Sequence, residues 1–352
     1  MKGLVLAGGK GSRLRPFTYS GAKQLVPIAN TPVLHFPIRH LVEAGISEIG
    51  IVVGDTEQQI REAMGDGSIF GARFTYIPQP EPLGIAHAVS LAQPFLAEDP
   101  FVLYLGENVL RGGIASFVER FRRSVATSGV VLKRVPDARA FGVAEMEGNR
   151  LAHIVEKPAI PPTDLAVIGV YAFRSEVFEV IARQAPSSRN ELEIADSING
   201  LLARGRSVEV TVTDEYWIDT GKMEDMLHAN RVILDTLGPT PDRGLLLADS
   251  TVTGPVTIEP GAVIERCTLT GPLVIGDGAI LRDSRIGPYV AIGARFALSR
   301  VGIQNSIVME DTVLADCPDV RDSMIGRYVR VAGAPAGARL TLGDHSRVEA
   351  TE

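Results

Sequence analysis

The chain begins MKGLVLAGGKGSRLRPFT (residues 1–18), in which a short apolar run leads directly into a loop of three glycines, a serine and three cations. The apolar run has the composition of a buried strand. In the loop, consecutive backbone N–H groups can form a concave nest for anionic oxygen, and the arginines can bind phosphate through two hydrogen bonds. The loop lacks both the GKS or GKT ending of a P-loop and the GxGxxG spacing of a dinucleotide fold. It therefore predicts a different kind of phosphate site, suited to a triphosphate.

The alternation of apolar and amphipathic segments continues to about residue 236. The apolar runs predict strands at 3–8, 48–54, 73–78, 100–106, 129–135, 167–173 and 207–214. The amphipathic segments predict helices at 33–45, 56–65, 84–96, 112–129 and 191–205. Strands with continuous apolar runs are typical of a sheet covered by helices on both faces. The pattern predicts a doubly wound, Rossmann-like α/β fold with a mixed, mostly parallel sheet, whose ligands bind beyond the carboxyl ends of the strands.

The pattern changes after a Gly/Pro-rich linker, LGPTPDRG (237–244). Apolar residues then recur every six positions, with glycine and small residues between them. The recurring residues are Val252, Ile258 and Ile264, then Val274, Ile280, Ile286, Ile292 and Leu298, then Val301, Ile307 and Val313. A six-residue period fits a parallel β-helix. The period slips between Ile264 and Val274 and again near Val301, so some coils are expected to carry insertions or bends. The expected domains are therefore 1–240, which is catalytic, and 245–352, which is a β-helix of hexapeptide-like repeats.

Composition excludes several classes of protein. A net charge of -7 without a basic block argues against a nucleic-acid partner. Two cysteines, Cys267 and Cys317, give neither a disulfide framework nor a metal-ligand spacing, which favours a reducing cytoplasm. No apolar stretch approaches the roughly 20 residues of a membrane span, and Met1 to Leu6 is too short for a signal segment, so no membrane partner is expected.

The N-terminal half resembles the sugar-1-phosphate nucleotidylyltransferases, whose signature is an AGGxGTRLxPLT loop followed by KxLxP. Here these segments read AGGKGSRLRPFT and AKQLVPI. Further matches follow in the same order: YIPQPEPLGIAHAV, YLGEN, FGVAE, IVEKP, VIGVYAF, ELEIADSI and WIDTG. The glutamine of AKQLVPI and the repeats look most like the long-form glucose-1-phosphate thymidylyltransferases, including those of antibiotic deoxysugar pathways. That resemblance implies a left-handed β-helix and a homo-oligomer.

The chemistry can also be argued from the residues. A sugar 1-phosphate is already an oxyanion, so it needs alignment with the triphosphate and charge neutralisation rather than a general base. Arg13 is expected to bind the β- and γ-phosphates and the leaving pyrophosphate. Lys23 is expected to touch the α-phosphate or to bridge both substrates, and Lys157 to hold the sugar phosphate.

The resemblance extends these roles to two sets of binding residues. A glutamine amide offers a donor and an acceptor together, which suits thymine or uracil. Expected to bind the nucleotide are Leu6, Ala7, Gly8, Gly9, Gly11, Ser12, Arg13, Gln24, Gln79, Pro82 and Gly84. Expected to bind the sugar phosphate are Asn108, Gly142, Glu156, Lys157, Gly169 and Trp217. Phe141 stands where many relatives have tyrosine, which leaves the exact sugar open.

The expected Mg²⁺ site departs from the family pattern. Relatives usually read GDN after the fourth strand, and that aspartate joins a second one in WxDTG. This chain reads GEN, so Glu107 replaces the first aspartate while Asp219 keeps the second. Mg²⁺ demands ligands at about 2.0 to 2.1 Å, so the extra methylene matters. Three interpretations of Glu107 follow. It is a relocated but working metal ligand, or it marks a slow enzyme with an altered substrate or metal preference, or it marks an inactivated copy kept for another role.

The expected function is Mg²⁺-dependent transfer of a nucleotidyl group from dTTP to glucose 1-phosphate, giving dTDP-glucose and pyrophosphate. One alternative is the same reaction with UTP, ATP or GTP, or with another sugar or cyclitol 1-phosphate. A second is a nucleotide-sugar-binding regulatory subunit of low or no activity. Acyl transfer by the repeats is disfavoured, because such chemistry commonly needs a histidine on a coil and His345, at the terminal cap, is the only one beyond residue 228.

Overall fold

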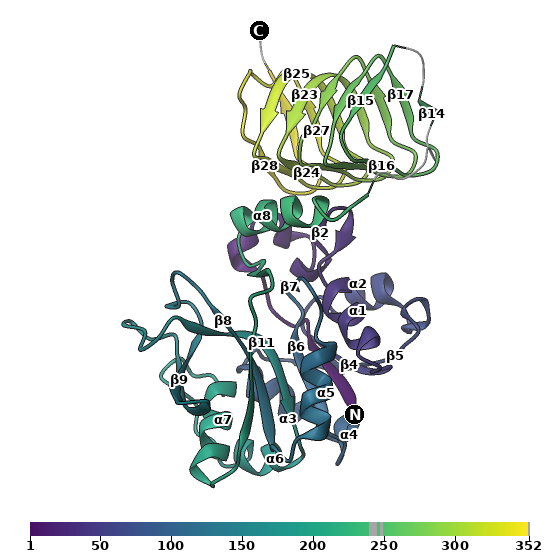
Figure 1. Ribbon diagram of the computed structural model, residues 1–352. Coiled ribbons are helices and arrows are strands. Elements are labelled where there is room, and N and C mark those ends of the chain that lie inside the picture. Colours follow the sequence, from purple (N-terminus) through teal and green to yellow (C-terminus); the bar gives the residue numbers. More distant parts are fainter. Residues whose placement is uncertain (239–244, 247–248, 351–352) are drawn as a thin grey trace. The chain divides into compact units, whose positions relative to one another are not determined.

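The computed structural model describes residues 1–238, 245–246 and 249–350 (Figure 1). Contacts divide the chain into two compact units. The first unit is 1–10 with 34–219, and the second is 11–33 with 220–352. The expected boundary between 240 and 245 lies outside the described residues, as does most of the linker, and stays a prediction. By contacts, the segments 11–33 and 220–238 group with the repeat region.

The first unit is built on a mixed sheet with the strand order β10-β9-β11-β6-β1-β4-β5. In addition, β8 pairs with β11, and β12 pairs with β8. Its strands are β1 (Lys2–Leu6), β4 (Glu48–Val53), β5 (Arg73–Pro78), β6 (Phe101–Leu105), β8 (Ser128–Arg134), β9 (Gly142–Glu147), β10 (Arg150–Glu156), β11 (Leu165–Phe173) and β12 (Val208–Val212). Neighbours among β6, β1, β4 and β5 are parallel. β11 is antiparallel to β6, β8 and β9. A separate two-stranded ribbon joins β7 (Asn108–Leu110) to β13 (Trp217–Asp219).

Helices cover both faces of this sheet. They are α1 (His35–Glu43), α2 (Glu57–Met64), α3 (Ile85–Leu91), α4 (Gln93–Leu96), α5 (Ala115–Arg123), α6 (Glu176–Ile181) and α7 (Ile194–Ala203). The largest core lies between the sheet and α3, α6 and α7, and Val130 of β8 belongs to it. Its neighbour Gly129 faces Phe117 and Phe121 of α5 instead. Because successive strand residues point to opposite faces, α5 covers the other side, and the doubly wound fold is confirmed.

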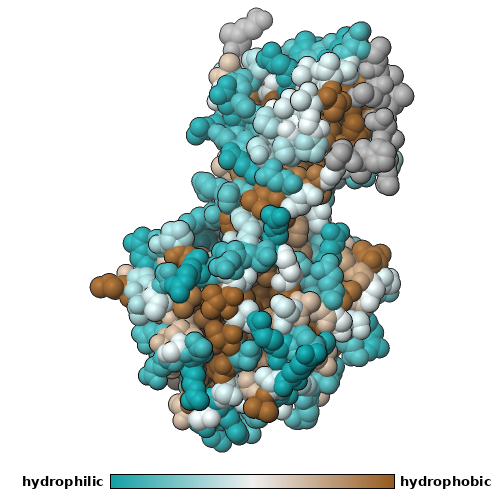
Figure 2. All heavy atoms as spheres, in the orientation of Figure 1, coloured by the Kyte–Doolittle hydropathy of each residue, from teal (hydrophilic) through white to brown (hydrophobic). Residues whose placement is uncertain are grey.

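All seven strands predicted in this half are present, as are helices in all five predicted segments. The pattern did not predict the β9–β10 hairpin, the β7–β13 ribbon, α6, or α8 (Met223–Leu234) of the second unit. No helix of the described residues has the length and apolar character needed to span a bilayer. On the face drawn in Figure 2, hydrophilic residues predominate on each unit and hydrophobic ones form smaller groups.

The second unit contains stacked coils of parallel strands, as expected for a β-helix (Figure 1). One sheet has the order β14-β17-β20-β23-β21-β18-β15, extended through β25, β27 and β29, and a second runs β16-β19-β22-β24-β26-β28. Their bounds are β14 (Leu245–Leu246), β15 (Thr251–Thr253), β16 (Val256–Ile258), β17 (Val263–Glu265), β18 (Thr268–Thr270), β19 (Leu273–Ile275), β20 (Ile280–Arg282), β21 (Arg285–Ile286), β22 (Val290–Ile292), β23 (Ala297–Gln304), β24 (Ser306–Val308), β25 (Val313–Arg321), β26 (Met324–Ile325), β27 (Arg330–Ala332), β28 (Thr341–Leu342) and β29 (Arg347–Glu349). The left hand of the winding stays a prediction.

The expected six-residue period fails at three positions. Val252, Ile280 and Val313 are 43%, 39% and 38% exposed. The stacked interior residues are Ile264, Leu281, Leu298, Leu314 and Val331, which pair from coil to coil and are buried. Their separations are 17, 17, 16 and 17 residues by their numbers. A coil of three six-residue segments would contain 18 residues, which is longer than the observed separations. Positions spaced by six residues therefore shift away from the interior positions along the chain.

Helix α8 and the segment 11–33 pack on the coils within this unit. Ala29 shares a buried apolar cluster with Leu234 of α8 and with Val274 and Ala291 of the coils. The segment contains a short antiparallel pair, β2 (Pro27–Ile28) with β3 (Thr31–Pro32). The residues after the glycine loop therefore form part of the same compact body as the β-helix.

Candidate active site

The first part of the glycine loop lies at the carboxyl end of β1, in the first unit. Leu6 ends the strand, and the backbone N–H of the buried Ala7 donates to Val52 O (2.7 Å). A Cβ added at Gly8 would lie 3.3 Å from Gln79 Oε1 and 3.4 Å from the backbone nitrogen of Gly54. The structure therefore places Gly8 beside Gln79, at the edge where a doubly wound sheet binds its ligands.

Gln79 is held by two neighbours. Its amide Nε2 donates to Gly84 O (3.3 Å) and lies 3.1 Å from Nδ1 of His87. Gly84 directly precedes α3, which carries His87. The structure thus brings Gln79 and Gly84 together, and His87 joins them as a neighbour that the sequence pattern did not assign to the site. Gly9 and Pro82 are exposed.

The rest of the loop belongs to the second unit. Gly11 has a left-handed backbone (φ 63°) and precedes the 3₁₀ turn Ser12–Leu14, in which Ser12 and Arg13 are exposed. A Cβ added at Gly11 would lie 2.8 Å from Lys23 Cβ. Thr18 Oγ1 donates to Gly11 O (2.8 Å). The loop therefore folds back on Lys23, so the arginine turn and this lysine share one small structure.

Gln24 lies in the 3₁₀ turn Lys23–Leu25 and is almost completely buried, with 1% of its surface exposed. Its amide oxygen Oε1 is buried and accepts no hydrogen bond from the described residues. A buried acceptor without a donor costs free energy of about 1–3 kcal/mol. Such an atom is suited to a ligand that brings an N–H group.

Asn108 and Gly169 lie in direct contact in the first unit. Asn108 is buried, and its Nδ2 donates to Ile168 O (3.0 Å). Gly169 has φ 73° where the pairing of β11 with β8 shifts register, and a Cβ there would lie 2.1 Å from Asn108 Nδ2. Only glycine fits this position without strain.

Gly142, Glu156 and Lys157 form a second group in the same unit. Gly142 begins β9 and pairs with Glu156 at the end of β10, and a Cβ at Gly142 would lie 3.1 Å from Glu156 Oε2. Lys157 follows in a left-handed conformation (φ 43°), and its Nζ lies 3.7 Å from Glu156 Oε1. Burial raises the pKa of Glu156, the nearby Glu193 adds to this rise, and Lys157 and Arg189 oppose it.

Arg189 contacts this group, although the sequence pattern did not assign it to the site. Its guanidinium NH2 lies 3.3 Å from Glu156 Oε1 and 2.7 Å from Glu193 Oε1. It lies two positions before the ELEIADSI segment, and a cation next to a matched motif is the signal that could have pointed to it. Sequence alone does not show that it meets a carboxylate 33 residues away.

Trp217 and Phe141 pack against each other edge to face, with ring centroids 5.1 Å apart. The indole Nε1 of Trp217 is buried and donates to no acceptor of the described residues. Phe141 O accepts a hydrogen bond from the backbone N–H of Lys157 (3.0 Å). The aromatic pair therefore adjoins the turn that carries Lys157.

Glu107 lies in the turn that directly precedes β7, and Asp219 ends β13, the partner strand in the β7–β13 ribbon. Asp219 ends β13 opposite Asn108, the residue that follows Glu107. No cluster of three or more His, Cys, Asp or Glu residues suited to a metal occurs in residues 1–238 and 249–350. Two carboxylates still fit Mg²⁺, because this ion is usually bound through one or two carboxylates plus substrate phosphates and water.

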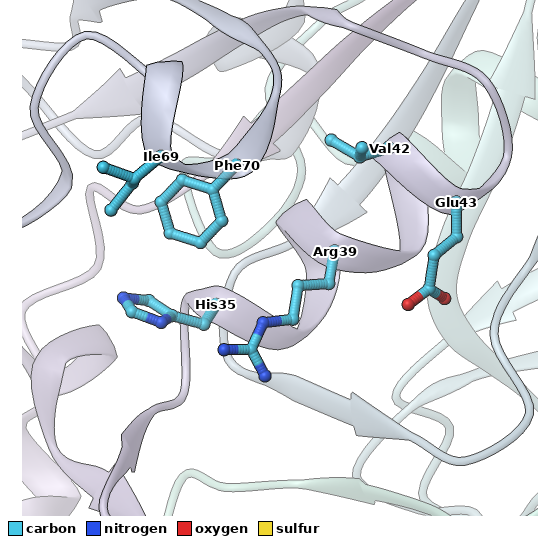
Figure 3. Close-up of a pocket in the computed structure, with 6 residues that line it drawn as sticks. All are labelled: His35, Arg39, Val42, Glu43, Ile69 and Phe70. Atoms are coloured by element: carbon cyan, nitrogen blue, oxygen red, sulfur yellow. The ribbon is translucent and has the colours of Figure 1, made fainter.

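A cavity of about 310 Å³ lies elsewhere in the first unit, and it contains none of the predicted site residues. Figure 3 shows His35, Arg39 and Glu43 on α1, with Phe70 and Ile69 on the facing turn. The rings of His35 and Phe70 meet edge to face, with centroids 4.9 Å apart. Burial, helped by Arg39, lowers the pKa of His35 to about 4, so its imidazole is neutral at pH 7.

Comparison with known proteins agrees with this geometry. A family model for nucleotidyl transferases matches residues 2–236. The glucose-1-phosphate thymidylyltransferase of Streptomyces griseus is 44% identical over 353 residues, covering 99% of each chain. The low-salt glycan biosynthesis nucleotidyltransferase Agl11 of Haloferax volcanii is 41% identical over 358 residues, covering 99% of this chain and 100% of that protein.

A solved structure extends the likeness to three dimensions. The protein from Bacillus anthracis, described as a glucose-1-phosphate thymidylyltransferase in complex with a sucrose, superposes with a TM-score of 0.63 at 36% identity. The match covers 66% of this chain and 94% of that one. The sequence motifs, the glycine loop at the end of β1 and these matches lead to one conclusion: the chain belongs to the nucleotidyl transferase family.

Proposed function

We propose that this enzyme transfers the thymidylyl group of dTTP to glucose 1-phosphate and releases pyrophosphate. A phosphate oxygen of the sugar attacks the α-phosphorus, and the bond from this phosphorus to the oxygen that bridges to the β-phosphate breaks. The electron pair of that bond leaves with pyrophosphate, and dTDP-glucose is formed. The attacking oxygen is already anionic at neutral pH, so the protein has to align two anions and neutralise charge.

The observation that carries the proposal is the buried oxygen of Gln24, which lacks a donor among the described residues. The imide edge of thymine supplies an N–H group for this oxygen and a carbonyl for the amide NH₂. Gln79 and Gly84 are proposed to complete the base site. The relative from Streptomyces griseus, which shares almost the whole length of this chain, carries the same thymidylyl specificity in its name.

Triphosphate binding is assigned to the glycine loop and its cations. Leu6, Ala7 and Pro82 are proposed as further nucleotide contacts. The backbone N–H groups of Gly8, Gly9, Gly11 and Ser12 are proposed to donate hydrogen bonds to phosphate oxygens. Arg13 binds the β- and γ-phosphates, where a guanidinium can form two parallel hydrogen bonds. Lys23, packed against Gly11, is proposed to bind the α-phosphate.

The sugar phosphate is assigned to the group around Glu156. The Glu156 carboxylate accepts hydrogen bonds from sugar hydroxyls, and the Lys157 ammonium binds the phosphate. Asn108, Gly142, Gly169 and Trp217 complete this set, and the buried indole N–H of Trp217 is available to donate to a sugar oxygen.

Glu107 and Asp219 are proposed to hold Mg²⁺. When bound, the cation neutralises charge that develops on the phosphates during the transfer. A homo-oligomer and a cytoplasmic location are part of the same proposal. The free, buried Cys267 and Cys317 suit a reducing compartment. Sedimentation of the purified chain checks the oligomer.

The test is pyrophosphate release from a panel of dTTP, UTP, ATP and GTP, each with glucose 1-phosphate, mannose 1-phosphate and a cyclitol phosphate. We expect the highest kcat/KM with dTTP and glucose 1-phosphate. Turnover with ATP or GTP alone would overturn the thymidylyl assignment. Binding of nucleotides without any turnover would favour a regulatory subunit.

A further inference from the structure

The segment that carries Arg13, Lys23 and Gln24 is held by the β-helix at two places, both within the second unit. The first is the terminal coil. There Ser20 Oγ donates to Asp344 Oδ2 (2.8 Å). A Cβ added at Gly343 would lie 3.0 Å from both Cβ and O of Pro16, so these two turns are in close contact.

Asp344 is itself fixed on the coil. Its Oδ1 accepts the backbone N–H of Arg327 (2.8 Å), and the Arg327 guanidinium lies 3.9 Å from its Oδ2. Only 9% of the Asp344 side chain is exposed. A carboxylate held on one side by the coil therefore offers its other oxygen to Ser20 in a fixed position.

The second place lies nearer the middle of the solenoid. Asn30 Nδ2 donates to Ile292 O (2.6 Å). The backbone N–H of Ala29 donates to Asn230 Oδ1 (2.9 Å), and Ala29 packs in the apolar cluster with the coils. Lys23 and Gln24 lie between the two attachment places.

A short series of contacts connects the terminal coil to the arginine turn. Ser20 follows the 3₁₀ turn Phe17–Tyr19, and Thr18 of that turn donates to Gly11 O (2.8 Å). Gly11 begins the turn with Arg13 and packs on Lys23. A shift of the 16–20 turn would therefore move the backbone from which both cations extend.

We infer that Asp344 is a positioning residue for nucleotide binding, and that the terminal coil of the β-helix, through its contacts with Ser20 and Pro16, sets the geometry of the Arg13 loop. The inference rests on the proposed function. It gives the repeat domain a part in the reaction without any chemistry of its own. Because the groups proposed to bind the sugar lie in the other unit, the effect should be confined to the nucleotide.

The test uses the full-length enzyme with the single variants Ser20→Ala and Asp344→Ala and the double variant. We expect each single variant to raise the KM for dTTP about fivefold, the effect of losing one modest hydrogen bond, with the KM for glucose 1-phosphate unchanged. The double variant should be no worse than the stronger single one, because both remove the same contact. Ser20→Thr keeps the hydroxyl and should restore the wild-type KM.

Asp316→Ala is the matched control, since it removes a carboxylate of the same domain that is paired with Arg300 (2.6 Å). It should leave both KM values unchanged. The inference is overturned if the dTTP KM stays unchanged in both single variants, if both substrates weaken equally, or if Asp316→Ala has the same effect. An inactive wild-type enzyme would instead refute the proposed function, so the two failures are distinguishable.

Discussion

Asp219 lies opposite Asn108 across the antiparallel β7–β13 ribbon, and Glu107 directly precedes Asn108 in the chain. The ribbon is short, and it is separate from the main sheet. Its register therefore places Asp219 one position away from pairing with Glu107, although the two acidic residues are more than 100 positions apart in the sequence. A pair of this kind is sufficient for Mg²⁺ when substrate phosphates supply the other ligands.

Removing the charge of Glu107 should abolish most activity, whereas shortening its side chain should not. We expect Glu107→Gln to lower kcat by about 100-fold, because the metal loses an anionic ligand in a site that works by charge neutralisation. Glu107→Asp should stay within about threefold, since the ion can relocate with its phosphates. Chelation of the metal should stop turnover of the wild type.

The kcat of both variants is measured as pyrophosphate release at several Mg²⁺ concentrations. Glu119→Gln on α5 is the control for the loss of an unrelated carboxylate. A gain of more than tenfold in Glu107→Asp would contradict this prediction, because it would show that the natural glutamate impairs the enzyme.

Ionised Glu156 should lower the stability of the fold and strengthen the binding of the sugar phosphate. Its pKa is raised, chiefly by burial, so the folded state disfavours the ionised form. Ionised Glu156 therefore subtracts from stability above its folded pKa, and this loss is relieved as the pH falls through that value. We expect Glu156→Gln to leave the Tm at pH 7 unchanged or higher, while the KM for glucose 1-phosphate rises about tenfold.

The pH dependence gives a second measurement of the same group. Wild-type binding of glucose 1-phosphate should weaken as the pH falls through the pKa of Glu156. In Glu156→Gln, the KM for glucose 1-phosphate should no longer rise over this pH range. Thermal unfolding and KM measured from pH 4 to 8 check both statements. A fall in Tm at pH 7 without a change in KM would show a purely structural role.

Gln24 should be dispensable for stability and necessary for the nucleotide. Its buried oxygen has no donor among the described residues, so Gln24→Leu should not lower the free energy of unfolding. The KM for dTTP should rise at least tenfold because the base loses its partner. Gln184→Leu is the matched control: Gln184 donates to Glu193 O (2.8 Å) and accepts from Ser197 (2.8 Å), so its loss should destabilise the fold.

Gly169→Ala should disturb the sugar site through a steric clash. The new Cβ would lie 2.1 Å from Asn108 Nδ2, and Asn108 would have to leave Ile168 O. Gly205→Ala is a matched control, because Gly205 has a similar φ of 71° with no atom within 4 Å. Both should lose about 1–2 kcal/mol from the left-handed backbone, and only Gly169→Ala should also raise the KM for glucose 1-phosphate. Equal effects of the two variants on unfolding and KM would contradict the clash.

The fold of the first unit was largely predictable, because buried parallel strands are continuous apolar runs such as 48–54 and 100–106. The β9–β10 hairpin escaped prediction, since its residues mix buried, half-buried and exposed positions and include charges, so they form no continuous apolar run. The direction of β11, antiparallel to β6, was not predictable either. A buried strand has the same composition in both directions, and only the connections decide which way it runs.

For the site, too, contacts within a motif were predictable from the sequence, and contacts between distant segments were not. Residues inside motifs, such as Gln79 and Gly84, were predicted, and the structure places them together. Arg189 was missed, because its contact with Glu156 depends on how two distant segments pack. The attachment of Ser20 to Asp344 was equally inaccessible to sequence, since the residues are 324 positions apart and belong to no motif.

The coil length of about 17 residues predicts that two adjacent residues of the β-helix, Ile280 and Leu281, contribute differently to its stability. Leu281 is fully buried in the interior stack, whereas Ile280, which the six-residue period placed there, is 39% exposed. We expect Leu281→Ala to destabilise the β-helix by about 2–5 kcal/mol, because it leaves a cavity in a packed interior. Ile280→Ala should cost less than about 1 kcal/mol, in keeping with a partly exposed side chain. Urea unfolding of the full chain, followed by circular dichroism, measures both. If Ile280→Ala proved the more damaging, the 17-residue coil would be the wrong description of the interior, and the six-residue period would have to be restored.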